Sequence, residues 1–245
     1  MSPHEPQPVY LLAGGHGRGL RRTFADLRAI IDGLGKAKPV VAYVGVASLE
    51  ENWMIYAVSS GLIKAGCRCR LARVVMARPR ADLAKAREVL RNADAVFMSG
   101  GDVEAGMRIL AEKDMVGFLQ DLARGGKPFI GISAGTIMLA REWVRWKDPD
   151  DDATAEIFPC LGIAPLLCDT HAEDDDWEEL KTALRLKGPG LGYGLVSGSQ
   201  LRVYPDGRLE AKSGPVAVFE ARARKIQRLA DLEPLVDDPG GPPEA

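Results

Sequence analysis

The residues with the clearest chemical potential are the five from Gly131 to Gly135, which read Gly-Ile-Ser-Ala-Gly. An apolar run, Pro128–Ile132, precedes the serine, and a run with helical spacing, Ala134–Glu142, follows it. A G-x-S-x-G motif between a strand and a helix lifts its serine hydroxyl above the edge of a sheet. The helix N-terminus and the amide of Ala134 can then face a developing oxyanion. The pattern favours Ser133 as a nucleophile over a plain tight turn with a helix-capping serine.

A nucleophilic serine needs a base, and the chain contains three histidines. His4 lies in a polar N-terminal segment, whereas His171 comes just after a strand predicted over Ile163–Cys168. Open α/β sheets bind their ligands at that edge. We therefore expect His171 to be the base, with a surface histidine in an acidic segment as the alternative. His16, in a glycine-rich turn after an earlier predicted strand, is expected to contribute to substrate binding.

A carboxylate usually holds the imidazole of such a pair in the correct tautomer. The chain between Ser133 and His171 offers several acids, most of them in one loop: Asp148, Asp150, Asp151, Asp152 and Glu156. Most members of an acidic run face solvent, so the residues alone leave this choice open.

A second glycine turn, Ser99-Gly100-Gly101-Asp102, follows a short apolar run. Glycines at this point let the backbone approach a ligand and leave free amides. We expect Gly100 and Asp102 to take part in substrate binding, and Asp102 also has the sequence context of a helix N-cap. The glycine-rich segment around His16 lacks the lysine and the spacing of a phosphate loop, and the four cysteines lack zinc-site spacing. The sequence therefore predicts neither a metal nor another cofactor.

Apolar runs alternate with amphipathic stretches along most of the chain, which is typical of a mainly parallel, doubly wound α/β sheet. Beyond Gly190 the pattern changes to short strands with turns, which predicts a small antiparallel extension, and Ala221–Ala230 has the composition of a last helix. We expect residues 1–236 to form a single domain and the Pro-, Gly- and acid-rich tail, 237–245, to be disordered.

Composition narrows the class of protein further. The 32 Lys and Arg residues balance 34 Asp and Glu residues, a net charge of −2 that argues against nucleic-acid binding. Hydrophobic residues make up 46% of the chain, enough for a sizeable core, yet no stretch is long and apolar enough to span a membrane. The first eight residues lack the basic and apolar regions of a signal peptide. A cytoplasmic protein is therefore expected.

Taken in order, the glycine turn, Ser99–Asp102, the motif around Ser133 and Asp169-Thr170-His171 resemble the dipeptidase E and cyanophycinase family of serine peptidases. The resemblance covers about Val9 to Val218. It implies the fold of class I glutamine amidotransferases, with serine where those enzymes carry cysteine. It further implies that Ser133 is the nucleophile, that His171 is the base and that the amides of Gly101 and Ala134 form the oxyanion hole. Asp148 looks like the triad aspartate of dipeptidase E, whereas Asp151 looks more like the cyanophycinase glutamate, and of the two we choose Asp148.

The sequence also departs from this family. Its members usually carry an aromatic residue after the histidine and arginines shortly beyond, whereas this chain has Ala172 and then Glu173-Asp174-Asp175-Asp176. An acidic run facing the cleft would favour basic or neutral substrates over aspartyl ones, although a solvent-facing run would say nothing about specificity. A peptidase acting on small peptides or isopeptide-like amides is the main hypothesis, with a homodimer as the candidate assembly. An esterase-type hydrolase and a non-catalytic protein of the same fold are the alternatives.

Overall fold

The computed structural model describes residues 7–223 and 225–234. The tail predicted to be disordered, 237–245, lies outside the described residues. Within them, the main sheet has seven strands in the order β11-β10-β1-β5-β4-β2-β3. These strands are β1 (Val9–Leu12), β2 (Val40–Val44), β3 (Arg70–Val74), β4 (Ala95–Met98), β5 (Phe129–Ile132), β10 (Gln200–Val203) and β11 (Leu209–Lys212).

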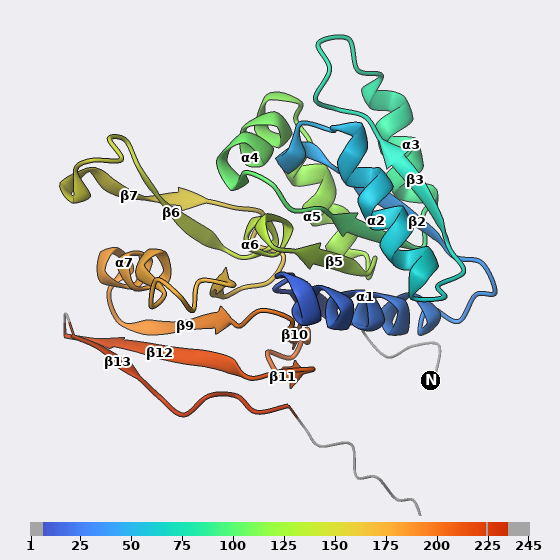
Figure 1. The fold of residues 1–245 in the computed structure, drawn as a ribbon. Coiled ribbons are helices and arrows are strands. Elements are labelled where there is room, and N and C mark those ends of the chain that lie inside the picture. The colour runs from blue at the N-terminus through green and yellow to red at the C-terminus, as the bar shows by residue number, and fades with distance from the viewer. Residues whose placement is uncertain (1–6, 224, 235–245) are drawn as a thin grey trace, which may run out of the picture.

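The five strands from β1 to β3 in that order pair in parallel, and helices cover both faces (Figure 1). The helices are α1 (Gly17–Asp32), α2 (Asn52–Lys64), α3 (Leu83–Asn92), α4 (Val103–Glu112), α5 (Val116–Arg124), α6 (Ala134–Leu139) and α7 (Glu178–Lys187). Successive residues of a strand point to opposite faces. Accordingly, Leu12 packs with Leu27 of α1 and Leu62 of α2, whereas Leu11 packs with Met138 of α6. The predicted doubly wound, mainly parallel α/β fold is confirmed.

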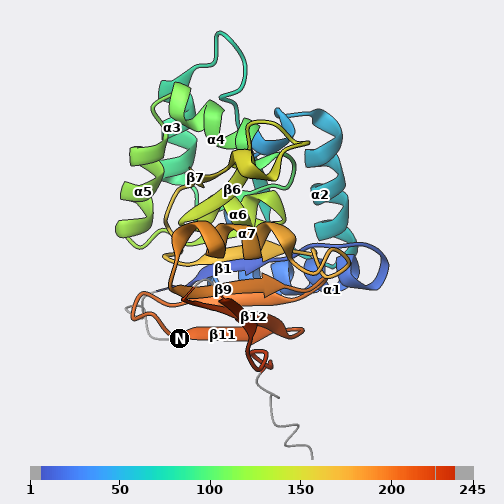
Figure 2. The same cartoon turned by 90° about the vertical axis from the view of Figure 1, so that its left-hand side faces the viewer.

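The antiparallel region is divided between two sheets. β10 pairs antiparallel with β1 and with β11, so the hairpin around the predicted turn at residues 205–207 extends the main sheet. A second sheet has the order β13-β12-β9-β8, with β8 (Leu167–Thr170), β9 (Gly190–Leu195), β12 (Val216–Arg222) and β13 (Lys225–Arg228). Its buried face packs against α7 through Trp177, Leu180 and Phe219. Figure 2 shows α7 lying across this sheet.

The helix predicted over Ala221–Ala230 is wrong. This segment forms the end of β12 and all of β13, which pair antiparallel from Phe219↔Arg228 to Arg222↔Lys225. The charged residues of the segment gave a helix-like composition, but tertiary pairing with β9 overrides that local preference.

A hairpin of β6 (Glu142–Trp146) and β7 (Ala155–Pro159) was not predicted either. The expected helix over Ala134–Glu142 ends at Leu139, and the chain turns into β6 within three residues. In Figure 1 the hairpin projects beyond the main sheet, on the same side as α7. The acidic loop 148–152 therefore connects two strands at the tip of this hairpin. None of the helices in the described part of the chain combines the length and the apolar character needed to cross a membrane.

Candidate active site

Ser133 lies on a strained turn between β5 and α6. Its backbone angles are φ 52° and ψ −125°, outside the regions that non-glycine residues usually adopt. The two motif glycines make this turn sterically possible. A Cβ on Gly131 would lie 2.7 Å from the Gly135 carbonyl oxygen, and a Cβ on Gly135 would lie 2.1 Å from that of Met98. The sequence places Ser133 at the carboxyl end of β5 because only glycine permits these approaches.

The end of β1 anchors the turn from the other side. The Leu12 carbonyl accepts hydrogen bonds from the Ser133 amide at 3.0 Å and from the Thr136 hydroxyl at 2.8 Å. The Leu12 amide in turn donates to Thr136 Oγ1 at 3.1 Å. Thr136 is fully buried. A single threonine thus joins the first turn of α6 to the neighbouring strand and holds the serine in place.

We expect Thr136→Val to lower the free energy of unfolding by about 1–3 kcal/mol, because it leaves the buried Leu12 amide without an acceptor. Urea unfolding measures this change. The matched control is Thr182→Val, whose hydroxyl bonds the exposed side chains of Glu178 and Arg185 and which should change stability by less than about 0.5 kcal/mol. Equal effects of the two substitutions would contradict the anchoring role.

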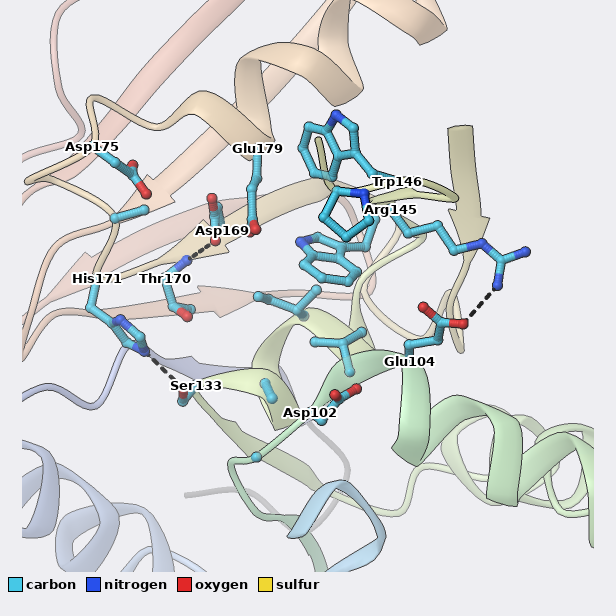
Figure 3. Close-up of a pocket in the computed structure, with 17 residues that line it drawn as sticks. Asp102, Glu104, Ser133, Arg145, Trp146, Asp169, Thr170, His171, Asp175 and Glu179 are labelled. Atoms are coloured by element: carbon cyan, nitrogen blue, oxygen red, sulfur yellow. Dashed lines mark hydrogen bonds and ion pairs between the residues drawn. The ribbon is translucent and has the colours of Figure 1, made fainter. Parts of the chain in front are cut away.

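His171 follows β8, and its side chain meets the serine. Its Nε2 atom lies 2.8 Å from Ser133 Oγ, a hydrogen bond drawn as a dashed line in Figure 3. The His171 backbone adopts φ 44°, and its amide donates to the Leu195 carbonyl at 2.8 Å. The two residues are brought together by parallel strands of different sheets. An imidazole in this position can take the proton of the hydroxyl as the oxygen attacks a carbonyl.

Two backbone amides near the serine are open to a ligand. Ala134 occupies the first position of α6, where an amide has no intrahelical acceptor. The Gly101 amide donates no hydrogen bond to the described residues. Gly101 has φ +140°, and a Cβ there would lie 2.2 Å from the Ala47 carbonyl oxygen, so glycine is required at this turn. Gly101, Ser133 and Ala134 line one pocket together.

The other predicted binding residues lie in different places. Asp102 lines the same pocket and caps α4, since its Oδ1 accepts from the Ala105 amide at 2.8 Å. Gly100 is buried behind the serine, where a Cβ would lie 3.3 Å from Ser133 Cβ. His16 is exposed at the start of α1 and is not among the residues that line the pocket.

Asp148 lies in the β6–β7 loop, next to the pocket-lining Pro149. Its carboxylate accepts from the Asp150 amide at 3.1 Å, and within the described chain no hydrogen bond joins it to His171. Asp151 accepts from the Ala153 amide at 2.9 Å. The structure therefore places both triad candidates in hydrogen bonds internal to their own loop.

Glu173 is an acid within electrostatic reach of His171. Burial alone would raise the pKa of Glu173, but hydrogen bonds from Ser197 and the charge of His171 outweigh this and lower it. Its Oε1 accepts from the Ser197 amide at 3.0 Å, which fixes the carboxylate beside the base. The sequence showed Glu173 only as part of an acidic run.

The pocket has a volume of about 600 Å³ and extends from Ser133 and His171 to β6 and α7. Several of its residues were not predicted, because they come from the unrecognised hairpin or from α7. These are Trp143, Arg145, Trp146 and Glu179, together with Asp169 at the end of β8. Only the position of the hairpin and α7 residues in the folded chain identifies them, whereas Asp169 stands in the Asp169-Thr170-His171 motif without having been selected as a site residue.

Asp169 is the most perturbed carboxyl of the pocket. Only 2% of the residue is exposed, and burial raises the pKa of Asp169 from its usual 3.8 to about 7. The negative charges of Glu179 and Asp175 contribute to this rise, while the backbone amide of Thr170 offsets part of it. Burial and the charge of Asp175 also raise the pKa of Glu179, against a smaller opposing effect of the Trp143 indole.

These shifts predict how stability depends on pH. Between the unfolded value near 3.8 and about 7, the folded state binds the Asp169 proton and the unfolded state does not. The free energy of unfolding should therefore fall as the pH rises through this range. Asn mimics the protonated acid, so we expect Asp169→Asn to gain about 2–3 kcal/mol relative to the unchanged protein between pH 5 and pH 8. Urea unfolding at both pH values tests this, and a difference independent of pH would contradict the assigned cause.

The fold and this site define an α/β protein of the class I glutamine amidotransferase type, with serine at the strand–helix turn. The model of peptidase family S51 matches residues 9–208. The chain belongs to this peptidase family, as its sequence resemblance predicted.

Two solved structures share the fold. A peptidase from an acI-B1 Actinobacterium superimposes with a TM-score of 0.67 at 15% identity, over 94% of this chain and 98% of that one. A protein described as peptidase E from Listeria monocytogenes superimposes with a TM-score of 0.61, also at 15% identity, over 84% of this chain and 98% of that one.

Curated relatives match over a shorter stretch. The pyridoxal 5'-phosphate synthase subunit PdxT of Methanopyrus kandleri is 30% identical over 101 residues, 41% of this chain and 50% of that protein. The PdxT subunit of Geobacillus stearothermophilus is 26% identical over 111 residues, which are 45% of this chain and 52% of that protein. The chain thus spans about half the length of the curated relatives it matches.

Proposed function

We propose that the protein hydrolyses small peptides or isopeptide-like amides, with Ser133 as the nucleophile and His171 as the general base. The observation that carries this proposal is the 2.8 Å contact between Ser133 Oγ and His171 Nε2, on a strained strand–helix turn. The membership of peptidase family S51 supports the same assignment.

In the proposed mechanism Ser133 Oγ attacks the scissile carbonyl while His171 Nε2 takes its proton. The amides of Gly101 and Ala134 donate to the oxyanion that forms on the carbonyl oxygen. His171 then returns the proton to the leaving amine, and an acyl group remains on Ser133. A water molecule, deprotonated by His171, attacks this ester and releases the carboxylic acid, which restores the free serine.

The acid that orients His171 remains a prediction. Asp148 is our choice from the family resemblance, and it would have to turn away from the Asp150 amide to reach the imidazole. In the substrate-binding part of the proposal, Asp102 lines the pocket, Gly100 supports the serine from behind, and His16 stays an untested prediction.

A substrate panel tests the reaction class. Neutral dipeptides, tripeptides, β-aspartyl isopeptides and p-nitrophenyl esters are incubated with the protein and with Ser133→Ala, and released amine or nitrophenol is measured. Turnover of at least one amide, lost in Ser133→Ala, is the expected result, whatever the rate on the intrinsically more reactive nitrophenyl esters. Hydrolysis of esters alone would favour the esterase alternative, and no turnover of any substrate would favour the non-catalytic one.

We also propose a cytoplasmic location, since Cys67, Cys69, Cys160 and Cys168 are free thiols. The homodimer stays a prediction.

A further inference from the structure

Three carboxylates gather in the pocket, away from the serine. Asp169 ends β8, Asp175 lies in the segment before α7, and Glu179 lies in its first turn. All three line the pocket, and Figure 3 shows them grouped across it from the Ser133 hydroxyl. The pKa values of Asp169 and Glu179 are both raised, in part by the negative charge of another member of the group. The three acids are therefore close enough to repel one another.

No cation of the described residues forms an ion pair with any of these three carboxylates. Arg145, the arginine that lines the pocket, is engaged elsewhere, by Glu104 at 2.9 Å and by Glu156 at 2.7 Å. Lys181 of α7 pairs with Asp176, whose side chain is exposed and which does not line the pocket. Above pH 7, where Asp169 is ionised, no cation of the described residues thus offsets the negative charge of this group by an ion pair.

Asp169 gives a second and independent indication of a ligand. Only 2% of the residue is exposed, although it lines the pocket. Its Oδ1 accepts from the Thr170 amide at 2.7 Å, but Oδ2 has no hydrogen-bond partner among the described residues. A buried acceptor without a partner costs free energy, which a donor supplied by a ligand would recover.

The pocket wall beside these acids is aromatic. Trp143 and Trp146 of β6 line it, both half-buried, and Figure 3 shows Trp146 on the same side as Glu179. Indole faces attract cations and pack well against the methylene stem of a lysine or the plane of a guanidinium. Carboxylates next to indoles therefore match a long basic side chain, and they disfavour an anionic one.

We propose that Asp169, Asp175 and Glu179, with Trp143 and Trp146, form a subsite for a lysine or arginine side chain of the peptide substrate. This inference rests on the proposed function of Ser133. The sequence suggested that the whole acidic run after His171 could face the cleft, but of these acids only Asp175 lines the pocket. Asp176 is held by Lys181, and Glu173 is held by Ser197. The determinants come from three separate elements, and two of the three acids lie on the segment where the family usually carries arginines.

The test uses matched peptides that differ only in charge. kcat/KM is measured for peptides with arginine or its neutral isostere citrulline, and with lysine or norleucine, on either side of the scissile bond. We expect the charged member to be preferred by about 10–100-fold at low salt in one of these positions, as for a hydrogen-bonded ion pair. Asp169→Asn and Glu179→Gln should reduce this ratio to about 1–3. Asp174→Asn removes the same charge from an exposed residue outside the pocket and should keep the ratio unchanged.

A ratio near 1 in the unchanged protein, or a ratio that both substitutions leave intact, would overturn the subsite. If neutral peptides are still hydrolysed and Ser133→Ala abolishes this, the proposed function survives such a failure. A binding experiment is independent of turnover: calorimetry with agmatine, a free guanidinium amine, on the Ser133→Ala protein. We expect binding that Asp169→Asn and Glu179→Gln each weaken at least about tenfold. Absence of binding, or equal binding by all three proteins, would contradict the inference even if the enzyme proved inactive.

Discussion

Replacing Ser133 or His171 by alanine should lower kcat on a neutral peptide by about 10⁴-fold or more. The two side chains act as one unit, because the Ser133 hydroxyl is a poor nucleophile unless the His171 imidazole, 2.8 Å away, takes its proton. The double substitution should therefore cost little more than either single one. The residual rate of these variants should come from the Gly101 and Ala134 amides and from substrate binding.

Steady-state kinetics with purified variants measures these effects, with unfolding curves to show that each variant is folded. Ser60→Ala is a suitable control, because Ser60 is exposed on α2 and lies outside the pocket. If either single variant kept a rate within tenfold of the unchanged protein, the roles given to Ser133 and His171 would be wrong. Strictly additive losses would show that the two residues act separately.

The second large effect is expected from Gly135→Ala. The added Cβ would lie 2.1 Å from the Met98 carbonyl oxygen and 2.8 Å from that of Ser99, both of them backbone atoms that cannot rotate away. α6 must move from the end of β4, and the Ser133 hydroxyl must move with it. We expect a loss of about 1–3 kcal/mol or more in the free energy of unfolding from overpacking. The loss of kcat/KM should be about 10²-fold, because catalysis is sensitive to displacements near 1 Å.

Gly117→Ala provides the matched control for this substitution. Gly117 is exposed in α5, and a Cβ there has no atom within 4 Å. Alanine should be neutral or stabilise the helix by up to about 1 kcal/mol, with full activity. If Gly135→Ala behaved like Gly117→Ala, the close approach of α6 to β4 would not hold the nucleophile in place.

The fold and the position of the serine could be predicted because their signals are local. The alternation of strands and helices is visible in short windows, and the glycines around Ser133 are required by contacts within a few residues or with the next strand. Asp102 likewise caps α4, as its context indicated. His171 could be selected because so few histidines were available.

The features that the sequence did not reveal depend on tertiary contacts. Glu142–Trp146 forms a strand because it pairs with Ala155–Pro159, and no local pattern distinguished it from the end of a helix. Lys225–Arg228 is a strand because β12 lies beside it. The direction of the Asp148 carboxylate is set by hydrogen bonds within the hairpin loop, and the grouping of Asp169 with Glu179 is set by the packing of α7 on β8. The single-domain boundary at residue 236 stays a prediction.

The most direct test of the central claim is to locate the adduct of a fluorophosphonate probe by mass spectrometry of the digested protein. Such a probe reacts with a serine whose hydroxyl is activated by a base and whose oxyanion hole is formed. We predict one adduct, on Ser133, that forms at least about 10²-fold more slowly in His171→Ala and is absent in Ser133→Ala. An adduct on another serine, or labelling of Ser133 at an unchanged rate without His171, would contradict the assignment.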